Sequence, residues 1–130
     1  MRISSILENQ KIEKRISITP EIAKKYIALG FEVILSENYG IHLGIKDKQF
    51  TDLGVKILKD ENEVINNADI IVQLGLISDE KSSLIKTNQT LIGVFNPYYN
   101  KEKIDEIKKK NINIFSLELL PRITRAQSMD

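Results

Sequence analysis

The amino-acid sequence predicts an α/β fold, a doubly wound and mainly parallel sheet of about five or six strands with helices on both faces. Short β-rich segments alternate with helical ones from end to end, which is typical of βαβ units. The segment Asp69–Leu74 is a near-continuous apolar run, as expected for a strand covered on both faces. No internal repeat or linker interrupts the pattern, so we expect a single domain over residues 1–130, wound like the flavodoxin and Rossmann folds.

Cap and turn signals define the individual elements. Thr19 is suited to cap a helix, Pro20 to occupy its first position, and Gly30 to end it. The same kind of reasoning predicts strands at Arg2–Leu7, Phe31–Ser36, Val55–Leu58, Asp69–Leu74, Thr90–Phe95 and Ile112–Leu117. It predicts helices at Pro20–Leu29, Asp47–Leu53, Asp60–Asn67, Ser78–Lys86 and Asn100–Lys110.

Composition limits the classes of function. The chain carries 19 lysine and arginine residues against 18 acidic ones, which is not the basic field that nucleic-acid binding needs. Cysteine is absent, which excludes disulfides and thiolate nucleophiles. The N-terminal segment becomes polar at Glu8, and no apolar run approaches the roughly 18 residues that cross a bilayer. We therefore expect no nucleic-acid partner and no insertion of this segment into a membrane.

Ligands of open α/β sheets bind beyond the carboxyl ends of the strands. The loops that leave predicted strands there are Gly75–Ile77, Asn96–Tyr99 and Leu119–Arg122. If the sheet is parallel, these loops share one edge. The glycine fingerprint of dinucleotide-binding folds, G-x-G-x-x-G, occurs nowhere in the sequence. His42 is the single histidine and has no companion for metal binding, so we interpret it as an ordinary loop residue and expect no metal site.

The final segment carries the most specific signal. Pro121–Asp130 reads Pro-Arg-Ile-Thr-Arg-Ala-Gln-Ser-Met-Asp. It is similar to the P-R-I-[ST]-R-A-Q-S-[LM]-D segment of proton-translocating NAD(P) transhydrogenases. Further matches, shared with alanine dehydrogenases, are Met1–Ile3, Arg15-x-x-x-Thr19-Pro20, Leu29–Val33 and Ala68-Asp69. The chain thus resembles the N-terminal portion of the NAD(H)-binding component, in the alpha subunit of a transhydrogenase.

The resemblance implies hydride transfer from NADH to NADP⁺ coupled to inward proton movement. NAD(H) is then the coenzyme of this component, and NADP(H) binds to a partner domain. The implied partners are a second copy of the chain in a homodimer and the NADP(H)-binding and membrane-spanning subunits. The implied location is the cytoplasm, peripheral to the bacterial inner membrane. Because the fingerprint is missing, we expect the coenzyme domain to lie outside this chain, which is then a truncated piece or one product of a split gene.

The resemblance places Arg122, Gln127 and Asp130 beside the nicotinamide end of NAD(H). A guanidinium holds amide or phosphate oxygens, an amide bonds ribose hydroxyls, and a carboxylate orients either group. The spacing Thr124-x-x-Gln127 also fits a helix capping box, and Asp130 also fits an acid in the first turn of a helix. We interpret Arg125 as a solvated helix residue.

Arg15 follows the first predicted strand and is a weaker candidate for coenzyme binding, with contact to Glu13 as the alternative. In alanine dehydrogenases the matching arginine holds the substrate carboxylate. The relatives continue the first strand through Gly and Pro to a basic residue, whereas Ser4–Leu7 precedes Glu8 here, which weakens any role for the first loop.

Two departures concern catalysis. Gly75 and Asn96 stand where alanine dehydrogenases place a substrate-binding lysine and a catalytic histidine. Neither replacement supplies the charge or the proton shuttle, so the sequence disfavours an alanine dehydrogenase-like enzyme. The first hypothesis is therefore a transhydrogenase fragment that is inactive alone, and the alternative is a non-catalytic module for dimerisation or docking.

Overall fold

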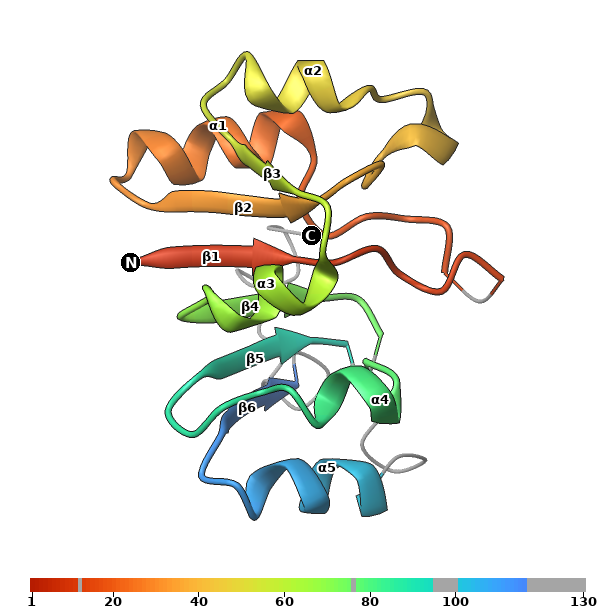
Figure 1. The fold of residues 1–130 in the computed structure, drawn as a ribbon, viewed down its shortest axis with the longest axis vertical. Helices are drawn as coiled ribbons and strands as arrows, with labels where there is room; N and C mark the ends of the chain where they lie inside the picture. Colours follow the sequence, from red (N-terminus) through yellow and green to blue (C-terminus); the bar gives the residue numbers. More distant parts are fainter. Residues whose placement is uncertain (12, 76, 95–100, 117–130) are drawn as a thin grey trace, which may run out of the picture.

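All strands of the sheet run parallel, in the order β3-β2-β1-β4-β5-β6. The structure, a computed structural model, describes residues 1–11, 13–75, 77–94 and 101–116. Its strands are β1 (Arg2–Ser5), β2 (Glu32–Ser36), β3 (Lys56–Leu58), β4 (Ile70–Gln73), β5 (Thr90–Gly93) and β6 (Asn113–Ser116). Its helices are α1 (Pro20–Ala28), the short 3-10 helix η1 (Ile41–Leu43), α2 (Asp47–Thr51), α3 (Glu61–Asn66), α4 (Asp79–Ser82) and α5 (Lys101–Lys108). Figure 1 shows the arrowheads of β1, β2, β4 and β5 pointing the same way.

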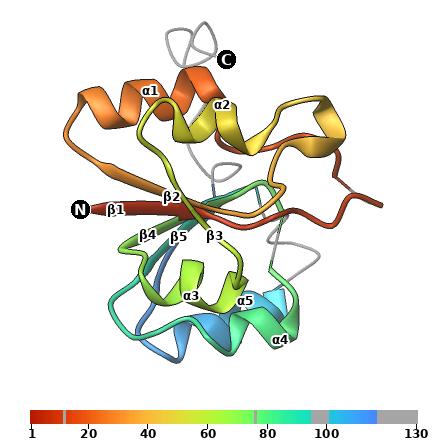
Figure 2. The ribbon, with the colours of Figure 1, turned by 45° about the horizontal axis from the view of Figure 1, so that its top comes forward.

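Helices cover both faces of the sheet, as the sequence predicts. In Figure 2, α1 and α2 lie on one side, and α3, α4 and α5 lie on the other. The buried side chains form two clusters, one for each face. Ala23 of α1 and Phe50 of α2 belong to the first cluster, and Val64 of α3 and Ile107 of α5 belong to the second. The doubly wound α/β prediction is confirmed.

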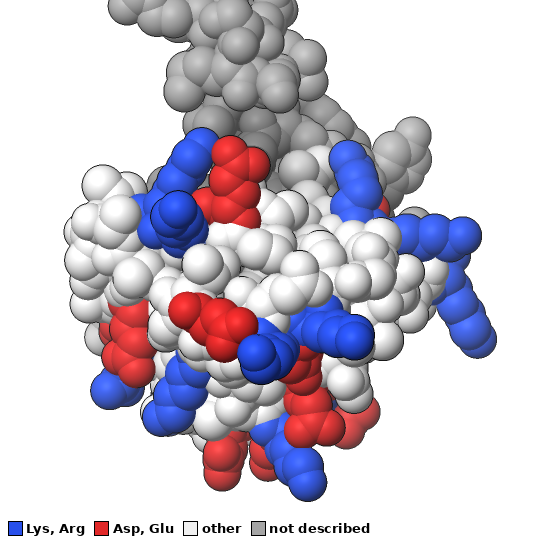
Figure 3. All heavy atoms as spheres, turned by 90° about the horizontal axis from the view of Figure 1, so that it is seen from above, with Lys and Arg blue, Asp and Glu red and all other residues white. Residues whose placement is uncertain are grey.

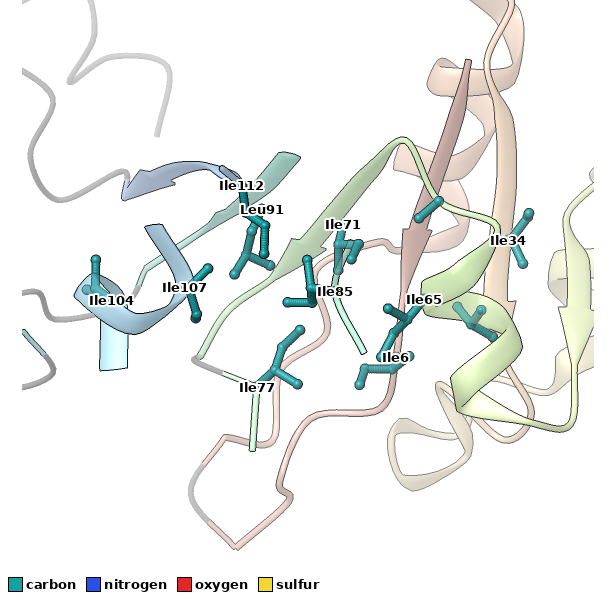
Figure 4. Packing of buried hydrophobic residues seen from close by; sticks show 12 residues of the cluster. Ile6, Ile34, Ile65, Ile71, Ile77, Ile85, Leu91, Ile104, Ile107 and Ile112 are labelled. Carbon is teal, nitrogen blue, oxygen red and sulfur yellow. The ribbon is translucent and has the colours of Figure 1, made fainter. Parts of the chain in front are cut away.

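The two-residue period of the strands distributes the apolar residues between these clusters. In β2, Val33 and Leu35 join the cluster under α1, whereas Ile34 between them joins the cluster under α3. In Figure 4 the second cluster is seen from close by, with Ile71 and Leu91 from the sheet among the side chains drawn. Each such buried side chain contributes about 1.5–3 kcal/mol relative to an exposed one. Burial on both faces is the reason that the strands read as continuous apolar runs.

Helix α1 begins and ends at the predicted signals. The Thr19 side chain accepts a hydrogen bond from the backbone N–H of Ile22 at 3.3 Å, and Pro20 occupies the first turn. Gly30 has a φ of 96°, a left-handed conformation that a residue with a Cβ adopts only with strain. The chain therefore turns at Gly30 towards β2, with less conformational strain than any other residue would have at this position.

Helix α4 is shorter than the predicted Ser78–Lys86 segment. It ends at Ser82, after which Leu84 and Ile85 donate to carbonyls only three residues back, from Lys81 and Ser82. The Ser83 hydroxyl donates to the Glu80 carbonyl at 2.7 Å. Such side-chain bonds compete with the regular helical ladder, so the consecutive serines end the helix early.

The charged side chains are interspersed rather than gathered. Figure 3 views the molecule from the α2 and β3 end, where lysine or arginine and acidic side chains alternate across the visible face. This agrees with the formal net charge of +1. Of the helices in the described ranges, none is both long enough and apolar enough to span a bilayer.

A buried glutamine ties α3 to the start of β5, the third element after it. The Gln89 amide nitrogen donates to the carbonyls of Ile65 and Ala68 at 2.7 Å each, and its oxygen accepts from the Lys86 N–H at 2.6 Å. Gln89 is 6% exposed and directly precedes β5, at the amino end of the sheet. It gives the Ala68 carbonyl a partner and adds a second donor to the Ile65 carbonyl, which also accepts from the Ala68 N–H at 3.2 Å.

Replacing Gln89 by leucine is expected to lower the free energy of unfolding by about 2–4 kcal/mol, because the Ala68 carbonyl and the Lys86 N–H lose the Gln89 amide and the Ile65 carbonyl loses one of its donors. Chemical denaturation followed by circular dichroism measures the change. Gln49→Leu, which removes one exposed hydrogen bond to the Lys46 N–H at the start of α2, is the control, and an equal loss in both variants would contradict the assignment.

Candidate functional site

The chain leaves β1 and β4 in opposite directions. These strands are neighbours, yet β1 leads to α1 on one face and β4 leads to α4 on the other. Where the winding of an open α/β sheet reverses, the loops separate beyond the carboxyl ends of the strands and leave a crevice that serves as the ligand site. The candidate site of this chain is therefore the region beyond Ser5 and Gln73.

A glutamine side chain spans the gap between the two strands. Direct pairing of β1 with β4 covers Ile3 with Ile70 and Ser4 with Ile71. Beyond it, the Gln73 amide oxygen accepts from the Ile6 N–H at 2.7 Å, and the Gln73 amide nitrogen donates to the Ile6 carbonyl at 3.0 Å. The carboxamide thus takes the place of a backbone partner. This explains why β1 ends at Ser5 rather than at the predicted Leu7.

Glu8 closes the gap one step further out. One carboxylate oxygen accepts from the Gln73 amide nitrogen at 2.9 Å and from the Leu74 N–H at 2.8 Å, and the other accepts from the Gly75 N–H at 3.1 Å. Glu8 is only 9% exposed. Burial raises the pKa of its carboxyl above the usual 4.5, against the opposing effect of the hydrogen bonds from Leu74, Gly75 and Gln73.

Tyr39 anchors the same region from the loop after β2. Its hydroxyl accepts from the N–H groups of Ser17 and Ile18 at 3.1 and 3.2 Å, and it lies 2.8 Å from the Ser5 hydroxyl. With both lone pairs occupied, the Tyr39 hydroxyl donates to Ser5. The hydrogen of Ser5 is then left for the Val72 carbonyl at 2.6 Å or the Gln73 oxygen at 2.9 Å. Burial raises the pKa of Tyr39.

These side chains join the loops after β1, β2 and β4 to the segment that precedes α1. Beside them lies a cavity of about 320 Å³. Lys81 of α4 stands at it, 3.7 Å from the Glu61 carboxylate and 2.9 Å from the Asn62 side-chain oxygen. The residues that line the cavity are Ile6, Leu7, Glu8, Asn9, Glu61, Gln73, Ile77, Ser78 and Lys81.

The described residues do not form a cradle for the pyrophosphate of a dinucleotide. Such a cradle uses glycines in the first strand-to-helix turn and free N–H groups at the helix start. Here the long connection of residues 6–19 separates β1 from α1 and contains no glycine. The Thr19 side chain and Pro20 already occupy the start of α1. The described part of this edge therefore lacks the features by which such folds hold a dinucleotide.

Comparison with known proteins identifies the family. A family model described as alanine dehydrogenase/PNT, N-terminal domain, matches residues 6–130. The chain belongs to this family. Among its relatives are the first portions of the NAD(P) transhydrogenase alpha subunit from Rickettsia prowazekii (strain Madrid E), 38% identical over 134 residues, and from Rhodospirillum rubrum, 33% identical over 135 residues. In each case the match covers 100% of this chain and 35% of the relative.

A solved structure shows the same fold for this N-terminal domain. The chain is similar to the transhydrogenase from Sinorhizobium meliloti, with a TM-score of 0.91 and 29% identity. The similarity covers 100% of this chain and 39% of that protein. The chain therefore spans about a third of the length of the curated relatives that it matches.

Arg15, a predicted coenzyme ligand, pairs with Glu13 in this N-terminal domain. Its guanidinium donates to both carboxylate oxygens of Glu13 at 2.9 Å. This contact lowers the pKa of Glu13 to about 2. The Arg15 side chain is 78% exposed, so it stands at the surface of the loop beyond β1 with its Nε–Nη2 edge paired with Glu13.

His42 contacts the same loop. Its Nε2 lies 2.7 Å from the Lys14 carbonyl and its Nδ1 lies 3.1 Å from the Gln10 amide nitrogen. Since a carbonyl only accepts and an amide nitrogen only donates, the Nε2–H tautomer satisfies both contacts. Within the described ranges, no group of three or more His, Asp or Glu side chains is placed to hold a metal ion.

Arg122, Gln127 and Asp130 lie outside the described residues, as does Asn96. Of the predicted loops, Gly75 is described and lies beside Glu8. The carboxyl ends of β4, β5 and β6 share one edge, because Gln73 pairs with Gly93 and Gly93 with Ser116. The strands that lead to the three predicted loops thus end at one edge, whereas the loops Asn96–Tyr99 and Leu119–Arg122 themselves lie outside the described residues.

Glu8, Gln73 and Tyr39 are the residues that the sequence interpretation missed. The departure at Ser4–Leu7 weakened the expected role of the first loop, yet Glu8 of that loop joins it to Leu74 and Gly75. One signal was available, because Gln73 is the polar residue within the apolar run Asp69–Leu74. A buried amide of this kind requires polar partners nearby.

Ser4 and Ser5 provide a matched test of the hydroxyl network. Both are fully buried, but among the described residues the Ser4 hydroxyl has no hydrogen-bond partner, whereas that of Ser5 contacts Tyr39, Val72 and Gln73. Ser5→Ala is expected to lower the free energy of unfolding by about 1–3 kcal/mol, and Ser4→Ala to leave it unchanged or raise it by about 1 kcal/mol. Urea denaturation distinguishes the two, and the reverse order would contradict the network.

Arg15→Ala is expected to return the pKa of Glu13 from about 2 toward its usual 4.5. Because the pKa is lowered by folding, the pair contributes to stability above pH 4.5, and this contribution is lost as the pH falls toward 2. Carbon-detected NMR of the Glu13 carboxyl measures the titration. Arg2→Ala, which removes the Arg2–Glu32 pair instead, is the control. If the pKa of Glu13 stays near 2 in Arg15→Ala, the lowering of that pKa does not come from the Arg15 side chain.

Proposed function

We propose that residues 1–130 are a single domain, the first subdomain of the NAD(H)-binding component of a proton-translocating NAD(P) transhydrogenase. The observation that carries the proposal is the 38% identity, over the whole chain, to a protein named as the first portion of an NAD(P) transhydrogenase alpha subunit. The closing segment Pro121–Asp130 supports it, since it matches the transhydrogenase pattern almost without interruption. The chain acts as a component of an enzyme and is inactive alone.

The chain's contribution to hydride transfer is orientation. The hydride moves directly between two nicotinamide coenzymes, so the protein needs no acid or base at that step. NAD(H) is held by a coenzyme domain outside these residues, in agreement with the missing pyrophosphate cradle. Arg122, Gln127 and Asp130 follow β6 in the sequence, and β6 ends at the same edge as β4 and β5. We assign these residues to the contact with the nicotinamide end of NAD(H), with Arg122 and Gln127 in the leading role.

The proposed assembly follows from the same assignment. The NADP(H)-binding domain and the membrane-spanning subunits of the transhydrogenase are partners of the component, and the component is a homodimer. This places the domain in the cytoplasm, peripheral to the inner membrane through its complex. Arg15 stays the weaker candidate for coenzyme binding, because Glu13 accepts from its Nε and Nη2 and the Nη1 donors stay available on an exposed side chain.

An alanine dehydrogenase-like activity is disfavoured by Gly75. At this position the chain offers a backbone N–H that already donates to Glu8, and it offers no ammonium group. A substrate carboxylate therefore finds no positive charge at this point of the crevice. Pyruvate- and ammonia-dependent oxidation of NADH by the assembled protein would contradict this inference.

Arg122→Ala is expected to slow hydride transfer more than it weakens NADH binding. In the chain combined with its coenzyme domain and an NADP(H)-binding partner, we expect the single-turnover rate to fall about tenfold or more, because misorientation of reacting groups is costly. The dissociation constant for NADH is expected to change less than about threefold, since the contacts that bind NADH equally before and during hydride transfer are unaffected.

Arg125→Ala is the matched control, with a nearby arginine removed that we interpret as solvated. Stopped-flow spectroscopy measures the rate, and calorimetry measures NADH binding. Normal reduction of NADP⁺ by a variant that lacks both Arg122 and Gln127 would overturn the site assignment.

A further inference from the structure

We propose that Glu8 is a positioning residue: its carboxylate fixes the backbone of Leu74 and Gly75, and thereby sets the loop after β4 against the nicotinamide end of the bound coenzyme. The proposal rests on the transhydrogenase function proposed above. It assigns a role to a residue of the first loop for which the sequence supports no functional expectation.

The geometry of Glu8 requires a carboxylate. Three N–H donors converge on it, from the Gln73 side chain and from the backbone of Leu74 and Gly75. An ionised carboxylate is acceptor-only, with both oxygens available, so it meets all three. An amide at this position has one accepting oxygen, and its NH₂ group would face at least one of the donors. Glutamine therefore preserves the shape of Glu8 and loses some of the bonding.

The charge of Glu8 is held by directional bonds instead of a cation. Within the described ranges, no lysine or arginine forms an ion pair with Glu8, while Lys81 in the adjoining cavity pairs with Glu61. Burying a carboxylate is costly, and a group used for stability alone is replaceable by an apolar one of similar volume. Hydrogen bonds from fixed N–H groups, unlike a diffuse apolar contact, specify position. The arrangement indicates a residue that defines where the loop lies.

A Cβ added at Gly75 would meet its nearest atom, Oε1 of Glu8, at 3.7 Å, an ordinary van der Waals distance. Packing against Glu8 therefore does not require glycine here. The contact between the two residues rests on the hydrogen bond from the Gly75 N–H to the carboxylate.

Amide NMR of the complete 130-residue chain tests the contact itself. In the wild type, the Leu74 and Gly75 amide resonances are expected to shift together in a single transition as Glu8 titrates. In Glu8→Gln this transition is expected to disappear, and hydrogen exchange at Gly75 is expected to quicken at least tenfold. Glu8→Asp retains the charge and shortens the reach, so it is expected to behave like Glu8→Gln. Unchanged Leu74 and Gly75 amides in both variants would overturn the proposal.

Kinetics of the assembled transhydrogenase test the function of the contact. Glu8→Gln is expected to lower the single-turnover rate of hydride transfer about tenfold or more, with less than about a threefold change in NADH affinity. Gln89→Leu, which weakens the fold at the opposite edge of the sheet, controls for stability loss and is expected to retain the rate at a temperature where it is folded.

The outcomes are distinguishable. A normal rate in Glu8→Gln beside a slow Arg122→Ala overturns the positioning role and leaves the transhydrogenase function standing. An equal loss in Glu8→Gln and Gln89→Leu reduces Glu8 to a stabilising residue. Absence of hydride transfer in the wild-type assembly overturns the proposed function, and the positioning role with it.

Discussion

The divergence of β1 and β4 is the constraint on which the rest of the site depends. Two parallel strands that send their connections to opposite faces cannot remain paired beyond their carboxyl ends. Backbone groups that lose their strand partner at such a separation need other hydrogen-bond partners, because the surrounding loops shield them from water. Gln73 supplies them to Ile6, and Glu8 supplies them to Leu74 and Gly75. The gap between the two strands is thus bridged by side chains that satisfy the backbone on both sides of it.

The same polar side chains link the crevice to the apolar core. Ser5 belongs to β1, and its hydroxyl contacts Tyr39, whose ring packs edge-on against Phe50 at a centroid separation of 6.0 Å. Tyr39 in turn fixes the backbone of Ser17 and Ile18 just before α1. A displacement of the loop after β1 would therefore disturb packing under α1 as well as the crevice. Interiors at crystal-like density transmit such displacements instead of absorbing them.

The fold was predictable from sequence because its elements depend on local signals, whereas the site depends on contacts between distant residues. The cap at Thr19, the turn at Gly30 and the apolar run of β4 each act within a few residues, and the structure confirms them. The Glu8–Gly75 contact joins residues 67 positions apart. Only the strand order brings them together, and no periodicity in the sequence encodes which polar side chain bridges the gap. The sequence did not predict the early end of α4 either. There the Ser83 hydroxyl donates to the Glu80 carbonyl and competes with the regular helical hydrogen bonds.

The division of labour in the proposed component follows from these facts. A domain without a glycine-rich turn and with a capped first helix is a poor holder of a dinucleotide, but a rigid edge is a good surface against which to orient one. The strand ends of β4, β5 and β6 lie in register along that edge, with β5 between β6 and β4, whose following loop Glu8 fixes. In the proposed component, residues after β6 orient the nicotinamide from the same edge at which Gln73 and Glu8 bridge the gap between β1 and β4.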